Sequence, residues 1–149
     1  MTTSVYATPE EAELAFYDAF QLSDLSAMMN VWADREFIEC IHPMSDRLQG
    51  RSKIEAGWRD IFASGLRVRI ERTHIHRTQD ALIAVHVLYE HLRIAGEQER
   101  HPPVIATNIY QLVEGSWRMV LHHASPSGGE EPEDEAEAHF AHEDKRRLH

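Results

Sequence analysis

The stretch ATNIYQLVEGSWRMVLHHASP, residues 106–126, decides the fold. It covers most of two runs rich in β-branched and aromatic residues, 104–113 and 116–125, which flank Glu114 and Gly115. Two such runs around a glycine-containing turn predict a β-hairpin. We expect a three-residue loop, 114–116, with a bulge at Gly115, because glycine readily adopts the left-handed backbone that this bulge needs.

The loop length decides which histidine of the second strand faces the interior. With a three-residue loop, Asn108 lies opposite His122 and Tyr110 lies opposite Val120, and directly opposite residues share a face of the sheet. The outer face then carries an apolar set: Trp117, Met119 and Leu121. A two-residue loop would instead turn His123 toward the face that holds Asn108.

Upstream of this hairpin, the hydrophobic pattern predicts more strands and, before them, helices. Residues 66–76 and 81–94 read as strands, and residues 36–43 as a shorter one that Pro43 ends. Three helices are expected from their start signals: Thr8 with Glu11, Ser23 or Asp24, and Ser52 with Glu55. Helices followed by strands indicate an α+β domain.

Charge and composition divide the chain into a domain, 1–126, and an acidic C-terminal tail, 127–149. The net charge is −10 over 149 residues. The tail holds three Lys/Arg and eight Asp/Glu, so it carries 3 − 8 = −5 of that charge. A solvated tail is the expectation, and a helix that docks through Phe140 is the alternative.

The same composition argues against several classes of partner. No basic stripe suits a nucleic-acid backbone, and no apolar run approaches the length of a membrane span. The N-terminus has no basic segment followed by an apolar one, and Cys40 is the only cysteine. We therefore expect a cytoplasmic protein that binds neither nucleic acid nor membrane.

Several segments together resemble the SnoaL-like branch of the nuclear transport factor 2-like superfamily, over residues 8–126. They are FYDAF (16–20), the helix 24–32, the strand ending in His42 and Pro43, LQGRSKI (48–54), and the hairpin 106–126. The resemblance implies a cone in which three N-terminal helices pack on a curved mixed or antiparallel sheet, a cystatin-like roll. It also implies a pocket between the helices and the concave face, and a homodimer through the convex face. The expected convex residues are Val85, Val87, Trp117, Met119 and Leu121.

The strand 81–94 supplies the candidate catalytic residues. His86 and Glu90 share one face of this strand, and buried polar groups cost free energy unless they are hydrogen-bonded or used. We predict that His86 or His42 acts as a general base and that Glu90 orients His86. His42 ends the first strand, near the mouth of the implied cone.

Six further residues are candidates for binding a ligand. By resemblance, an aromatic hydroxyl at Tyr17 holds an oxyanion, and we expect Asn108 and Tyr110 to assist it. Trp32 and Trp58 are expected at the pocket wall because a buried indole N–H needs a partner, and His122 is expected beside Asn108. For the aromatic residues of the helices, the alternative is simple packing in the core.

No metal or other cofactor is expected. His74 and His76 share a strand face, but no third-ligand motif accompanies them, and the chain has no glycine-rich phosphate loop. The superfamily's isomerases use an acid pair, whereas the first strand here offers Glu39, Cys40 and His42. We therefore predict a small-molecule pocket, either of a cofactor-free isomerase, dehydratase or hydrolase acting on a partly apolar carbonyl compound, or of a non-catalytic binding or dimerisation module.

Overall fold

The computed structural model of the chain describes residues 3–129 and 131–132. Its three helices are α1 (Pro9–Leu22), α2 (Leu25–Val31) and α3 (Arg51–Ala63). Its strands are β1 (Glu39–Ile41), β2 (Leu48–Gln49), β3 (Val68–Gln79), β4 (Ile83–Ile94), β5 (Val104–Val113) and β6 (Ser116–Pro126). The predicted tail, with Phe140, lies almost entirely outside the described residues.

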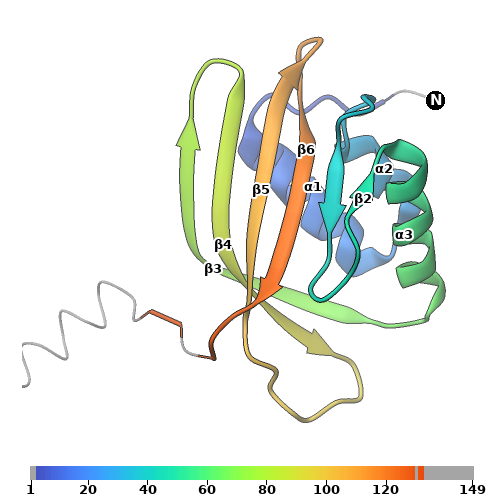
Figure 1. The fold of residues 1–149 in the computed structure, drawn as a ribbon, viewed down its shortest axis with the longest axis vertical. Coiled ribbons are helices and arrows are strands. Elements are labelled where there is room, and N and C mark those ends of the chain that lie inside the picture. Colours follow the sequence, from blue (N-terminus) through green and yellow to red (C-terminus); the bar gives the residue numbers. More distant parts are fainter. Residues whose placement is uncertain (1–2, 130, 133–149) are drawn as a thin grey trace, which may run out of the picture.

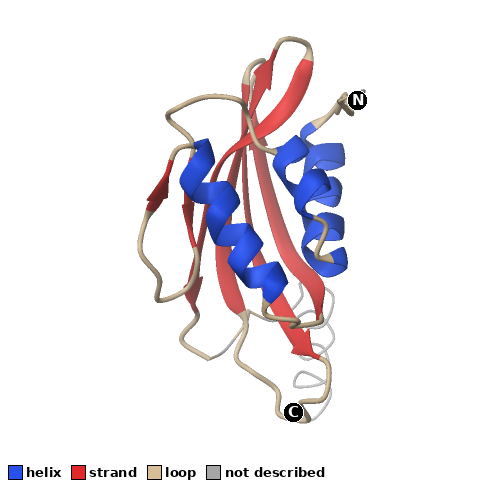
Figure 2. Cartoon of the chain, turned by 90° about the vertical axis from the view of Figure 1, so that its right-hand side faces the viewer, coloured by secondary structure: helices blue, strands red, loops and turns tan. Residues whose placement is uncertain are grey.

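The six strands form one curved sheet in the order β2-β1-β6-β5-β4-β3. Neighbouring strands are antiparallel except β1 and β6, which run parallel, so the sheet is mixed. All three helices lie on one side of the sheet (Figures 1 and 2). The predicted α+β architecture of three helices on a curved sheet is confirmed.

Two of the predicted helix starts are confirmed and one is wrong. The Thr8 side chain accepts a hydrogen bond from the Glu11 amide, and Asp24 caps α2 in the same way. In contrast, α3 begins at Arg51, so Ser52 lies inside its first turn rather than capping it. The Gly50 amide donates to the Ile38 carbonyl at 2.9 Å, which ties the chain to the sheet just before the helix begins.

The hairpin reaches one predicted pairing, Asn108 opposite His122, by a different route, whereas Tyr110 lies opposite Met119 and not opposite Val120 as predicted. Val113 lies opposite Ser116, so the loop has only Glu114 and Gly115, both with left-handed backbone (φ 49° and 81°). The predicted three-residue loop is therefore wrong. Asn108 nevertheless lies opposite His122, because the register shifts by one residue beyond the pairing of Tyr110 with Met119. The shift leaves Val120 as an extra residue in β6.

This register corrects the expected outer face. Trp117 and Met119 are buried in the core, with 5% and 0% of their surface exposed, because the shift puts them on the side of Tyr110. The other predicted members, Val85, Val87 and Leu121, do lie on the convex side, away from the helices. Tyr89, Ile105 and Ile109 join them there, each partly exposed.

Candidate functional site

A chain of four buried polar side chains crosses the interior between α1 and the sheet. The Tyr17 hydroxyl lies 2.5 Å from Glu90 Oε2 and 2.9 Å from Asn108 Nδ2. Asn108 Oδ1 in turn lies 2.6 Å from His122 Nδ1. Helix α1 supplies Tyr17, and three neighbouring strands supply Glu90 (β4), Asn108 (β5) and His122 (β6). The three strand residues point to the same face of the sheet, as does His86 of β4.

The amide of Asn108 sets the direction of every hydrogen bond in this chain. Its Nδ2 can only donate, so the Tyr17 oxygen accepts from it and gives its own proton to Glu90. Its Oδ1 can only accept, so His122 carries its proton on Nδ1. His122 Nε2 is left as a bare acceptor, without a hydrogen-bond partner among the described residues.

Burial gives the groups of this chain unusual proton affinities. Desolvation raises the pKa of Glu90 to about 7, although the hydrogen bond from Tyr17 acts in the opposite direction. Desolvation lowers the pKa of His122 to about 3, with His42 and His123 adding to the effect. It also lowers the pKa of His42 to about 4. Near neutral pH, Glu90 is thus the group of this set that exchanges a proton, and both histidines are neutral.

An aromatic layer lies beside the hydrogen-bonded side chains and covers them. The buried Trp58 ring makes edge contacts with Phe16, Phe20 and His42, with ring centroids 4.7–5.6 Å apart. The Phe62 ring also contacts Trp58, with ring centroids 5.6 Å apart, and Phe62 is only partly buried. The Trp58 indole N–H has no hydrogen-bond partner in the described part of the chain. A buried donor without a partner is rare, and water or a ligand commonly satisfies it.

Cys40 lies beside His42 in this layer, with its sulfur 3.5 Å from His42 Nε2. Burial, with a smaller effect from Glu90, raises the pKa of the Cys40 thiol far above its usual range. The thiol is therefore an inert protonated group under ordinary conditions.

His86 belongs to a second buried cluster, so the predicted pairing of His86 with Glu90 does not form. The carboxylate beside His86 is Glu13 of α1, whose Oε1 lies 3.4 Å from His86 Nδ1. That distance suits an ion pair, but no hydrogen bond is formed, and both ring nitrogens of His86 lack partners among residues 3–129 and 131–132. The Tyr110 ring lies 5.0 Å from the His86 ring, and its hydroxyl has no partner within the same ranges.

Two arginines compensate the buried charge of this second cluster. Glu13 Oε2 lies 3.1 Å from Arg77 and 3.3 Å from Arg72. Burial alone raises the pKa of Glu13, but His86 and the arginines outweigh it and hold that pKa below its ordinary value. Sequence reasoning missed Glu13. The available signal was its position four residues before Tyr17, which places both on one face of α1.

The nine predicted site residues therefore separate into three places. Glu90, Tyr17, Asn108 and His122 form the hydrogen-bonded chain, with His42 and Trp58 beside it. His86 and Tyr110 form the second cluster. Trp32 lies apart, at the end of α2, where it borders a hollow of about 1170 Å³ with Arg51 and Arg118.

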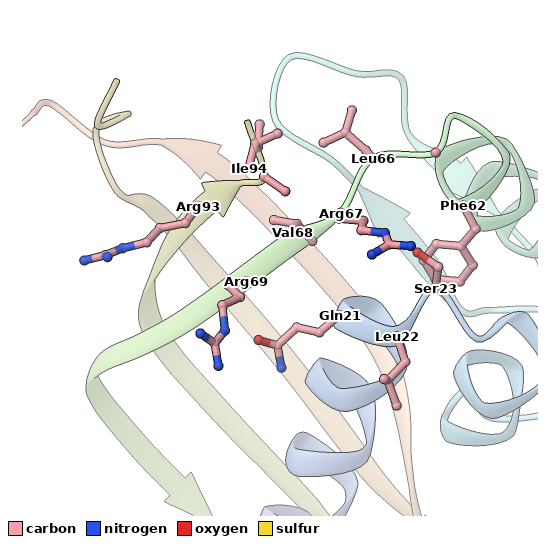
Figure 3. A pocket seen from close by; sticks show the side chains of 12 residues that line it. Gln21, Leu22, Ser23, Phe62, Leu66, Arg67, Val68, Arg69, Arg93 and Ile94 are labelled. Atoms are coloured by element: carbon pink, nitrogen blue, oxygen red, sulfur yellow. The ribbon is translucent and has the colours of Figure 1, made fainter. Parts of the chain in front are cut away.

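A further hollow, of about 660 Å³, lies where α1 and α3 end and β3 begins (Figure 3). Phe62 borders it, and Phe62 also contacts Trp58. The hollow therefore lies next to the aromatic layer, but no residue of the hydrogen-bonded chain lines it.

Metal and membrane features can be assessed for the described part of the chain. No three His, Cys, Asp or Glu side chains within residues 3–129 and 131–132 are arranged to hold a metal ion. His74 and His76 do not act as a pair, since a bulge lies between Thr73 and His76. His74 and His91 instead contact the carboxylate of Glu131, at 2.5 and 2.7 Å. None of the helices described is long and apolar enough to cross a membrane.

Comparison with known proteins identifies the family to which this fold belongs. The family model of the SnoaL-like domain matches residues 10–127. The chain belongs to this family, which is part of the nuclear transport factor 2-like superfamily. The resemblance inferred from the sequence is thus confirmed.

Solved structures support the same assignment. A Thiobacillus denitrificans protein, provisionally named a calcium/calmodulin-dependent protein kinase type II association domain, is 40% identical, with 83% of this chain and 98% of that chain covered and a TM-score of 0.75. A Streptomyces avermitilis protein of the superfamily, provisionally named a dehydratase, is 25% identical, covering 78% and 91% of the two chains with a TM-score of 0.71.

A curated relative extends the comparison to plants. The chain is 25% identical over 114 residues to the F-box protein SKIP8 of Arabidopsis thaliana, covering 74% of this chain and 46% of that protein. The chain thus spans less than half the length of this relative.

Proposed function

We propose that this protein binds a small, partly apolar carbonyl compound between α1 and the sheet and transfers a proton on it without a cofactor. Glu90 is the proton-transferring group, and Tyr17 is the hydrogen-bond donor paired with it. The observation that carries the proposal is the buried Glu90–Tyr17 contact of 2.5 Å together with a Glu90 pKa of about 7. A carboxyl group with a pKa near the working pH can both accept and return a proton efficiently.

The surroundings support a neutral, partly apolar ligand. His42 and His122 are uncharged near neutral pH, and the aromatic layer of Phe16, Phe20 and Trp58 is apolar. The acceptor at His122 Nε2 and the donor at Trp58 Nε1, neither bonded within the described residues, offer complementary partners to a ligand with one hydroxyl or carbonyl group. The ligand enters by displacing Phe62, the partly buried outer member of the layer.

Exchange of carbon-bound hydrogen tests this proposal with a simple ketone in place of the natural substrate. 2-Tetralone, an enolisable aromatic ketone, is incubated with the protein in D2O, and loss of its α-protons is followed by NMR. We expect protein-dependent exchange that falls about 100-fold in Glu90→Gln, which is in the range attributed to a general base. Glu71→Gln is the matched control, because Glu71 is an exposed glutamate of the neighbouring strand. Equal exchange by both variants would refute the role of Glu90.

A second candidate function is assembly. It is supported by the 40% identity to a protein named as an association domain and by the apolar side chains of the convex face. That face holds Val85, Val87, Tyr89, Ile105, Ile109 and Leu121. Apolar side chains gathered on a sheet face are typical of a protein–protein interface.

Light scattering tests the assembly. We expect a homodimer at micromolar concentration, and a monomer for Ile109→Lys, because a lysine in the middle of the face would be buried without a partner. Leu14→Lys is the control, since Leu14 is an exposed apolar residue of α1. A monomeric wild-type protein would exclude this homodimer.

A further inference from the structure

The smaller hollow, at the edge of the sheet, has a charge opposite to that of the whole chain. Its lining contains three arginines and no acidic residue, whereas the chain as a whole carries a net charge of −10. The arginines are Arg67, Arg69 and Arg93. None of them forms an ion pair with an acidic residue in the described part of the chain.

Two of these arginines occupy directly paired positions on neighbouring strands. Arg69 of β3 and Arg93 of β4 are direct cross-strand partners, and like charges in this position repel. In Figure 3, Arg67 reaches across the hollow toward Ser23 and Phe62, Arg69 points to the side of Gln21, and Arg93 extends outward from β4. A bound anion would offset part of this concentration of positive charge.

Most of the remaining lining is apolar, and two of its leucines are open to solvent. Leu22 and Leu66 expose 75% and 45% of their surface at opposite sides of the hollow. Phe62, Val68 and Ile94 complete the apolar part. A volume of about 660 Å³ is within the range of small-molecule sites, which are mostly apolar with a few fixed polar groups.

Hydrogen bonds hold both walls in place without a ligand. Gln21, near the end of α1, accepts a hydrogen bond from the Ile70 amide at 2.9 Å, which fastens the helix to the edge strand. The Ala95 amide donates to the Arg67 carbonyl at 2.9 Å, which closes the ends of β3 and β4 together. A preformed site of this kind loses little conformational entropy on binding.

We propose that this hollow is a binding site for amphipathic carboxylates of medium chain length. Arg67 and Arg69 bind the carboxylate, with Arg93 as a third cation at the rim. Leu22, Phe62 and Leu66 cover the alkyl or aryl chain. Arginine suits this role because its planar guanidinium matches a carboxylate with two parallel hydrogen bonds. The site is separate from Glu90 and does not depend on the proton transfer proposed above.

Octanoate is the probe, and octanol and acetate are its matched controls, since one lacks the charge and the other lacks the chain. Binding is measured on the full chain by isothermal titration calorimetry and by NMR of the methyl groups. We expect octanoate to bind at least tenfold more tightly than either control, with the largest shifts at Leu22, Leu66 and Ile94. We expect Arg67→Gln with Arg69→Gln to lower octanoate affinity about tenfold. Arg47→Gln, at an exposed arginine outside the hollow, should leave it unchanged.

Three results would overturn the site. Equal affinity for octanoate and octanol would show that the arginines do not select a carboxylate. Unchanged octanoate binding by the double arginine variant would have the same meaning. Octanoate-induced shifts at Met28 and Leu88 of the core, with none at Leu22 or Leu66, would place binding in the interior instead.

Discussion

The hydroxyl of Tyr17 lies 2.5 Å from Oε2 of Glu90, and neither side chain is exposed to solvent. Both groups lose the stabilisation that water gives their charged forms. Burial and the neighbouring Glu90 raise the pKa of Tyr17 well above its ordinary value, so its proton stays on the phenol oxygen. The contact is therefore a phenol donating to a carboxylate above neutral pH.

Removing the Tyr17 hydroxyl should change the titration of Glu90. The hydrogen bond from Tyr17 is the contribution that lowers the pKa of Glu90 against desolvation, so Tyr17→Phe should move this pKa above about 7. The shift can be read from the side-chain carboxyl carbon of Glu90 by NMR during a pH titration. Tyr110→Phe is the matched control, because the Tyr110 hydroxyl is buried but bonds to no described residue. A Glu90 pKa that is the same in both variants would contradict the assigned contact.

Glu90 should also make the stability of the protein depend on pH. Its pKa rises from 4.5 to about 7 on folding, so the folded state holds the proton more tightly than the unfolded state between these values. Stability from this group is full below pH 4.5 and is lost as the pH rises through about 7. The loss amounts to about 3 kcal/mol in the free energy of unfolding.

Glu90→Gln isolates this contribution, because glutamine keeps a hydrogen-bond acceptor for Tyr17 and does not ionise. The variant should gain stability relative to the wild type as the pH rises from 5 to 8, measured by urea unfolding at each pH. Glu71→Gln, at an exposed glutamate of β3, is the matched control. A constant difference between wild type and Glu90→Gln over this range would rule out the raised pKa.

His122 should remain neutral well into the acidic range, with its proton on Nδ1. Its pKa falls from 6.5 to about 3 on folding, so the neutral form is favoured and stability from this group is present above pH 6.5 and lost as the pH falls. Long-range nitrogen–proton NMR spectra distinguish the two tautomers directly. We expect the Nδ1–H form and no titration down to pH 5. Titration of His122 near pH 6.5 would show that its ring is not buried, and an Nε2–H tautomer would contradict its hydrogen bond to Asn108.

The sequence predicted the fold well because the relevant signals are local. The Thr8 cap, the alternation of the strands and the Glu114–Gly115 turn each act within a few residues. The register of β6 was harder, since an extra residue at Val120 has no sequence signature. For this reason the prediction that Trp117 and Met119 lie on the outer face was wrong. The predicted pairing of Asn108 with His122 was right, although the expected loop was one residue too long.

The site was only partly predictable, because its contacts join distant elements. Strand periodicity placed His86 and Glu90 on one face and the hairpin register placed Asn108 opposite His122; the structure confirms both and puts all four on the same face. Periodicity could not tell which of them α1 would contact. Tyr17 and Glu13 lie one turn apart on that helix, so Tyr17 contacts Glu90 and Glu13 lies beside His86. Only the placement of α1 over the sheet separates the two clusters.

The hairpin turn offers a test that is independent of the site. Glu114 has a left-handed backbone (φ 49°), which costs a glutamate about 1 kcal/mol and suits asparagine much better. Glu114→Asn should therefore raise the free energy of unfolding by about 0.5–1 kcal/mol in urea titrations. Gly115→Ala should act in the opposite sense, because Gly115 is also left-handed and nothing lies close enough to its Cα to obstruct a methyl group. Its loss of stability would then report backbone strain alone. If Glu114→Asn gave no gain while Gly115→Ala was tolerated, neither residue would have the left-handed backbone described here, and the register that brings His122 to Asn108 would need another origin.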